Sequence, residues 1–114
     1  MKIARAYLSA AVLMLIPTVA VAEGYTVVGA GVQSCGKWTT DKPNSYARNV
    51  DIEWVVGFIS GFNFVHGGDV SENVDAPAIV VWMDNYCSAH PLDPINLGAS
   101  SLIYELQRRH QKAR

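Results

Sequence analysis

The apolar side chains between residues 46 and 65 recur at intervals of four, four, four and three residues. This spacing places them on one face of a helix, and such a face is buried only when other elements pack against it. The segment is therefore predicted to be the central helix of a helical fold. The residues that define this face are Val50, Trp54, Phe58, Phe62 and Val65.

Two glycines, Gly57 and Gly61, lie four residues apart within the same predicted helix. Glycine lowers helix propensity, so we expect the close approach of another backbone, from this chain or from a second one, to compensate. Asn44 or Ser45 can cap the start of the helix, and the Gly67-Gly68 pair can end it with a left-handed residue.

A second helix is predicted over residues 76–89, because Asp75 is a good N-cap and Pro77 is tolerated in a first turn. Its apolar residues recur at helical steps, so the cysteine among them is expected to point inward. The residue before Pro91 is pushed out of helical geometry, which ends the helix at His90. The recurring residues are Ile79, Trp82, Met83, Tyr86 and Cys87.

A third helix is predicted to start with Asp93 as its N-cap and Pro94 as its first residue, and to end near His110. Leu92 and Leu97 would flank the start as a hydrophobic staple. The apolar face consists of Ile95, Ala99, Leu102 and Leu106.

Residues 1–22 have the anatomy of a secretory signal peptide. Lys2 and Arg5 precede an apolar run, and residues 20–22 read Ala-Val-Ala, a small-x-small cleavage pattern. The run is shorter than the roughly 20 residues that span a bilayer, so stable membrane insertion is not expected. We therefore predict cleavage after Ala22 and export to the periplasm.

The predicted fold class is all-α: a small bundle of three principal helices with one disulfide, preceded by a cleaved signal peptide. Residues 23–114 would form a single small helical domain, since a chain of this length has no room for a second one. Residues 23–44 begin with a short β-prone run, Tyr25 to Val28, and then become Gly-rich, so they are predicted to form an irregular N-terminal arm, with a short strand at its start as the alternative.

The stretch NYCSAHP, residues 85–91, places a thiol beside an imidazole, with the carboxyl group of Asp84 just before it. Such groups could form a catalytic site or half of a metal site. Cys87, however, lies near the C-terminal end of a predicted helix, where the dipole raises the pKa of a thiol. A zinc site would need Cys35 and His66 as further ligands, and their spacing matches no zinc motif.

An exported chain with two cysteines instead favours a disulfide between Cys35 and Cys87. Asp84 is then expected on the solvated helix face or in a local pair, and His90 at the helix end or on the surface. No metal site, catalytic residue or cofactor is predicted, and the chain is interpreted as a non-enzyme.

Charge argues against nucleic acid as a partner. Without Lys2 and Arg5, seven Lys and Arg residues remain against ten Asp and Glu residues, a formal charge of −3. Protein partners are expected instead. The candidate binding surface, for which core packing is the alternative, consists of Trp54, Phe58, Phe62 and Trp82.

Five short motifs, in this order and spacing, resemble the HdeA/HdeB family of small periplasmic acid-stress chaperones. The likeness covers roughly residues 34–106. The motifs are Ser34-Cys35-x-x-Trp38, Val56-Gly57-Phe58, the connector HGGDV at 66–70, APAIV at 76–80 and YCSAHP at 86–91.

The resemblance implies a helical fold with the Cys35–Cys87 disulfide, a homodimer near neutral pH, and exposure of apolar surface to unfolding periplasmic clients in acid. With all carboxylates neutralised and three His charged, residues 23–114 carry a formal +10, which opposes a compact state through self-repulsion. The last segment is more apolar than the lysine-rich end typical of that family.

The chain also resembles Tai-type immunity proteins, periplasmic helical proteins that block a secreted amidase toxin. The shared features are the order of the first cysteine, the G-x-x-x-G helix, the tyrosine and His90-Pro91 that end the next helix, and an Ala/Leu-rich last helix. The further cysteines usual in that family are missing here. An exported helical domain without either role is the third interpretation.

Overall fold

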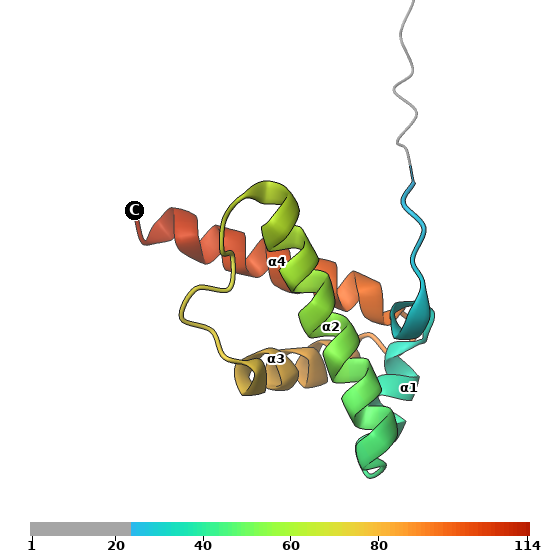
Figure 1. Ribbon diagram of the computed structural model, residues 1–114. Helices are drawn as coiled ribbons and strands as arrows, with labels where there is room; N and C mark the ends of the chain where they lie inside the picture. The colour runs from blue at the N-terminus through green and yellow to red at the C-terminus, as the bar shows by residue number, and fades with distance from the viewer. Residues whose placement is uncertain (1–23) are drawn as a thin grey trace, which may run out of the picture.

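The computed structural model describes residues 24–114 and confirms the all-α fold (Figure 1). The signal peptide predicted at 1–22 lies outside the described residues. The elements, in chain order, are the 3₁₀ turn η1 (Gly29–Val32) and the helices α1 (Cys35–Thr40), α2 (Ser45–His66), α3 (Ala76–Ala89) and α4 (Ile95–Lys112).

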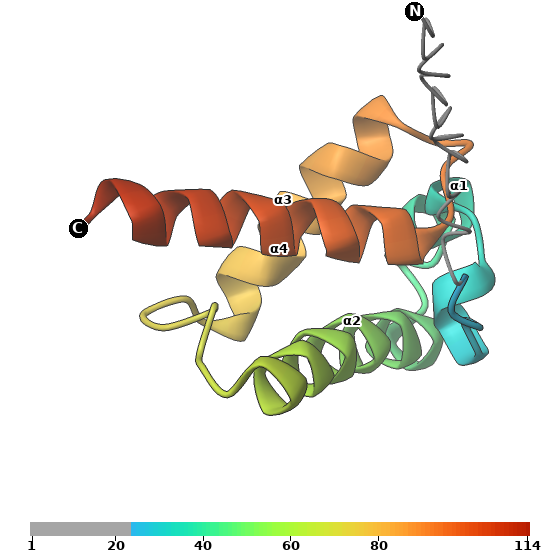
Figure 2. The ribbon, with the colours of Figure 1, turned by 90° about the horizontal axis from the view of Figure 1, so that it is seen from above.

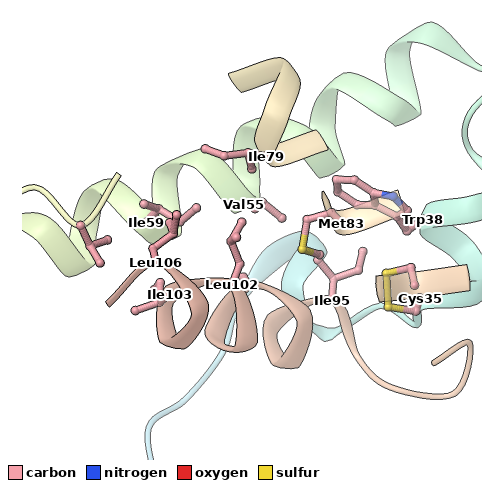
Figure 3. Packing of buried hydrophobic residues seen from close by; sticks show 13 residues of the cluster. Cys35, Trp38, Val55, Ile59, Ile79, Met83, Ile95, Leu102, Ile103 and Leu106 are labelled. Atoms are coloured by element: carbon pink, nitrogen blue, oxygen red, sulfur yellow. A yellow bond between two sulfur atoms is a disulfide. The ribbon is translucent and has the colours of Figure 1, made fainter. Parts of the chain in front are cut away.

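The three principal helices correspond to α2, α3 and α4, and they pack on one another around a common core. Figure 2 shows α2 and α4 both starting at the end of the molecule where η1 and α1 lie, while α3 crosses behind α4. The buried side chains come from all four α-helices, so the core fills the space between them (Figure 3). Its largest fully buried side chains include Trp38, Met83, Ile95 and Val55.

The helix α1 corrects the prediction of an irregular arm over 23–44. Ser34 is its N-cap and accepts a hydrogen bond from the backbone N–H of Lys37 at 3.2 Å. The N–H groups of Cys35 and Gly36 donate to the carbonyl groups of Asp93 at 2.7 Å and Pro91 at 2.9 Å. Six residues are too few to show a helical period, and much of what holds α1 comes from distant residues.

Three of the predicted helix ends are confirmed. Asn44 caps α2 by accepting from Ala47 N–H at 3.1 Å, and Asp75 caps α3 by accepting from Ala78 N–H at 2.9 Å. Gly67 ends α2 with a left-handed φ of 66°.

The predicted start of α4 is wrong by one residue, since Pro94 takes the N-cap position and provides no side-chain hydrogen bond. Asp93 instead accepts a hydrogen bond from the Tyr86 hydroxyl at 2.7 Å. The predicted staple is also wrong, because Leu92 is 93% exposed and Leu97 is 45% exposed. Leu92 lies in the turn whose Pro91 and Asp93 carbonyl groups accept hydrogen bonds from α1, and Leu97 lies in the first turn of α4.

The structure also corrects the expectation for the glycines of α2 within this chain. A Cβ atom added at Gly57 or Gly61 would meet nothing within 4 Å among the described residues. The close approach of helices occurs at Gly98 of α4, where a Cβ atom would lie 2.7 Å from Met83 Cε and 2.9 Å from Tyr86 Cδ1. Gly98 therefore allows α3 and α4 to pack closely, whereas Gly57 and Gly61 serve no contact in the described part of the chain.

Candidate functional site

A single carboxylate on α3 joins three separate parts of the chain. Asp84 accepts hydrogen bonds from Trp38 Nε1 of α1 at 2.7 Å and from Arg48 Nη2 of α2 at 2.6 Å. Its other oxygen lies 3.4 Å from Lys42 Nζ in the α1–α2 turn. The prediction of a solvated or locally paired Asp84 is therefore wrong, because its partners are 36 to 46 residues away in sequence. We call Asp84, Trp38, Arg48 and Lys42 the Asp84 junction.

The junction binds Arg48 on two sides. The guanidinium carbon lies 4.4 Å from the centroid of the Trp38 ring, within the range of cation–π attraction. Trp38 is fully buried, and the Asp84 side chain is only 24% exposed. Hydrogen bonds between charged groups are stronger in such partly dry surroundings.

These contacts change the acidity of Asp84. Burial by itself would raise the pKa of the carboxyl group. Hydrogen bonds from Arg48 and Trp38, together with the charges of Arg48 and Lys42, outweigh burial and leave the pKa below its usual value. The native state thus prefers the ionised form, and this part of its stability is lost as pH falls below about 4.

A second carboxylate, Asp51 of α2, behaves in the opposite way. It is 1% exposed, and its Oδ2 atom has no hydrogen-bond partner among residues 24–114. Burial and the neighbouring carboxylate of Asp41 raise its pKa to about 6, against the opposing charges of Lys37 and Arg48. The native state therefore binds a proton at Asp51 more tightly than the unfolded chain does.

Asp51→Asn should raise the free energy of unfolding at pH 7 by on the order of 1–3 kcal/mol, because an amide removes the buried charge. The gain should shrink as pH falls from about 6 to about 4, where native Asp51 is protonated as well. Urea unfolding of both proteins across this pH range measures the difference. Glu72→Gln, which neutralises an exposed carboxylate, is the control and should show no such window. An Asp51→Asn variant that is less stable at pH 7 would contradict the assignment.

Three apolar hollows flank the helices. One of about 710 Å³ lies between α3 and α4 beside Trp82, Val81 and Leu102. One of about 430 Å³ lies between α2 and residues 25–28, beside Trp54, Gly57 and Phe58. One of about 360 Å³ lies between α2 and α4, beside Phe58, Phe62 and Tyr104.

The four residues of the candidate binding surface do not form one surface. Trp54, Phe58 and Phe62 line hollows on the α2 side, whereas Trp82 lines the hollow between α3 and α4. All four are half-buried and pack against the core. The core-packing alternative therefore holds for all four rings, which also line the hollows, and their role in binding stays a prediction.

The structure separates the three chemical groups of the NYCSAHP region. Cys87 is buried in a disulfide with Cys35, whose Cα atom lies 4.6 Å away, as predicted. His90 ends α3: its backbone N–H donates to Tyr86 O at 2.9 Å and its ring packs on the Tyr86 ring. Asp84 faces the junction. Within the range that the structure covers, no three His, Cys, Asp or Glu side chains are grouped as metal ligands.

Sequence reasoning missed both carboxylate environments. The only available signal for Asp84 was its place one helical turn before Cys87. Because the predicted disulfide joins Cys87 to Cys35, this position lies near the segment that forms α1. For Asp51 the signal was its helical interval of four from Val55, a residue that faces the core.

The fold and these contacts define a small disulfide-linked helical protein with a carboxylate-centred junction and open apolar hollows. Comparison with protein-family models, with curated proteins and with solved structures found no match for this chain. None of the helices in residues 24–114 is long and apolar enough to cross a membrane.

Proposed function

We propose that this chain is an exported, non-enzymatic protein of the HdeA/HdeB type, which binds unfolding periplasmic proteins under acid stress. The observation that carries the proposal is the Asp84 junction. One carboxylate with a lowered pKa holds α3 to α1 and α2, and acid removes its charge.

Loss of that charge would release apolar surface without dissolving the fold. The side chains of Trp38 in α1 and Met83 in α3 are fully buried where α3 packs against α1 and α2. When Asp84 is protonated, Arg48 and Lys42 keep their charges and lose their anion, so α3 is held less firmly. The disulfide still ties the end of α3 to α1, which limits the opening.

Protonation of Asp51 keeps the proposed response from starting in mild acid. Protonation of Asp51 removes a buried charge from α2, which stabilises the native state in the range where pH falls from about 6 to about 4. Protonation of Asp84 destabilises the native state only below about pH 4. The native state should therefore persist in mild acid, and the Asp84 junction should open only in stronger acid. A response to severe acid stress requires this order.

An acid titration tests the proposal. The purified protein should bind a hydrophobic dye and suppress light scattering by an aggregating client at about pH 2–4, and do neither at pH 7. Asp84→Asn should move the onset of dye binding to higher pH, because its junction has no anion at any pH. Glu72→Gln should leave the onset unchanged. A protein that neither binds dye nor protects a client at pH 2–4 would end this proposal.

A second candidate function is that of a Tai-type immunity protein. It is favoured by the hollows that are already open in the folded chain and by α4, which buries six residues and is therefore a firm support. An immunity protein would bind one amidase toxin, encoded by a neighbouring gene, at neutral pH and would inhibit it. Absence of such a gene, or of binding at pH 7, would exclude this candidate.

A further inference from the structure

Half of the Trp, Tyr and Phe residues in the described part of the chain line two adjoining hollows. One hollow, of about 360 Å³, lies between α2 and α4, and the other, of about 430 Å³, lies between α2 and the N-terminal segment. The hollows adjoin because Tyr25 and Phe58 line both of them. We call the two hollows together the aromatic site. Its five rings are those of Tyr25, Trp54, Phe58, Phe62 and Tyr104.

The fold holds several of these rings in fixed positions. The indole Nε1 of Trp54 donates a hydrogen bond to Val28 O at 2.7 Å, which ties the N-terminal segment to α2. Trp54 stacks on Phe58 with ring centroids 5.2 Å apart, and Phe62 stacks on His66 at 3.9 Å. Phe58 and Phe62 are also four residues apart but do not stack, and the smaller hollow lies beside both. Each of these two rings therefore keeps one face that no stacked ring covers.

The charges of the aromatic site favour a cation as its ligand. No Lys or Arg side chain lines it, and its one carboxylate is that of Glu53, while His66 is formally neutral at pH 7. The face of an aromatic ring is partly negative and attracts cations. Within residues 24–114 that attraction is met at Trp38, whose ring centroid lies 4.4 Å from the guanidinium carbon of Arg48, and at none of the five rings of the site. The site therefore complements a cation from outside the chain.

The apolar rings favour a quaternary ammonium group over a primary one. A primary ammonium group is compact and strongly hydrated, so its entry between apolar rings costs more free energy. A quaternary ammonium group carries its charge on methyl groups, which cages of aromatic rings bind. The smaller hollow has a volume usual for small ligands, and Ser100 and Gln107 supply polar groups for a short polar tail.

We propose that the aromatic site binds a small, free quaternary ammonium compound with a short polar tail. Its methyl groups lie against Phe58, Phe62 and Tyr104, and Glu53 adds attraction at longer range. Phe58 and Phe62 are half-buried, so a ligand reaches their faces only by entering between α2 and α4. A free compound enters there, whereas a headgroup tethered to a bilayer is held outside.

This binding is independent of the proposed acid response. It is measured at pH 7, where the Asp84 junction is intact, and none of the five rings takes part in that junction. A protein without affinity for quaternary ammonium compounds would therefore leave client protection in acid untouched, and the reverse also holds.

Isothermal titration calorimetry at pH 7 tests the proposal, with choline as the probe. Choline should bind with a dissociation constant below about 1 mM. Its uncharged analogue 3,3-dimethyl-1-butanol, in which carbon replaces nitrogen, should bind at least about tenfold more weakly, and so should the primary ammonium compound ethanolamine. Absence of choline binding up to about 10 mM would overturn the proposal. Equal binding of the uncharged analogue would also overturn it, because the hollow would then be a purely apolar site.

Tyr104→Leu tests the contribution of one ring. Tyr104 is 77% exposed, so the exchange leaves the core intact, and the dissociation constant for choline should rise at least about threefold. Tyr104→Phe keeps the ring and should bind choline as the wild type does. Tyr46→Leu is the matched control, because Tyr46 is 80% exposed on α2 and lines neither hollow. A Tyr104→Leu protein with wild-type affinity would contradict the proposed position of the methyl groups.

Gly57→Lys places a cation of the chain itself in the site. A Cβ atom added at Gly57 meets nothing within 4 Å, so the new side chain fits, and Gly57 lines the same hollow as Trp54 and Phe58. Its ammonium group would compete with choline for the rings and repel it. Gly57→Met, of similar length but uncharged, is the matched control, and Gly57→Lys should bind choline at least about fivefold more weakly than this control. Equal affinities of the two variants would contradict a cation site.

Phosphatidylcholine vesicles distinguish a free compound from a lipid headgroup of the same chemistry. The wild-type protein should bind free choline in the calorimeter and should stay in the supernatant when such vesicles are sedimented. Sedimentation of the protein with the vesicles, without measurable binding of free choline, would overturn the assignment to a free compound.

Discussion

Replacing Cys87 with serine should lower the free energy of unfolding by on the order of 4 kcal/mol and leave the population of folded protein small at 37 °C. The disulfide closes a loop with a sequence separation of 52, and most of its effect comes from restricting the unfolded chain. Both sulfur atoms belong to fully buried residues, so the serine hydroxyl would also be buried in an apolar place. Urea unfolding monitored by circular dichroism measures the loss.

The double variant Cys35→Ser, Cys87→Ser is the control for this prediction. Because either single change already removes the bridge, the double change should cost little more than one of them. The free energy of unfolding of the wild-type protein in the presence of a reductant should be close to that of both variants. A Cys87→Ser protein with wild-type stability would show that the helices hold α1 in place without the bridge.

Asp84→Asn should lower the free energy of unfolding at pH 7 by about 2–4 kcal/mol, because Arg48 and Lys42 lose their anion in a partly buried place. The deficit should persist down to about pH 4 and then shrink, since the wild-type carboxyl group is itself protonated there. Urea unfolding at a series of pH values measures this profile.

The direction of this pH dependence distinguishes Asp84 from Asp51. A variant of Asp84 should converge on the wild type in strong acid, below about pH 4. A variant of Asp51 should converge on it in mild acid, between about pH 6 and pH 4. A deficit for Asp84→Asn that grows as pH falls below 4 would contradict the lowered pKa.

The long helices could be predicted from sequence because their signals are local. The apolar spacing from Val50 to Val65 marks α2, and its ends follow from Asn44 and Gly67. The same holds for Asp75 and the start of α3. Each cap is a contact between residues three or four apart, which the sequence displays directly.

The features that sequence reasoning missed depend on distant contacts. The first backbone N–H groups of α1 donate hydrogen bonds to carbonyl groups of the turn before α4, and the partners of Asp84 lie in α1, in α2 and in the turn between them. Within a few residues of Asp84, only the position of Cys87 one helical turn later indicates its environment, and that indication depends on the distant partner Cys35. The glycines illustrate the same limit, since propensity marks Gly57 as unusual but cannot say which neighbour it accommodates.

The hydrogen bonds from Cys35 and Gly36 to the carbonyl groups of Asp93 and Pro91 have a consequence for synthesis. The chain leaves the ribosome from its N-terminus, so the residues that hold α1 emerge more than fifty residues after it. Contacts this far apart in sequence form late, because a long loop must close first. In an exported chain Cys35 should therefore remain a free thiol until the segment with Cys87, Pro91 and Asp93 has also reached the oxidising compartment, and a thiol-blocking reagent added before that point should trap it.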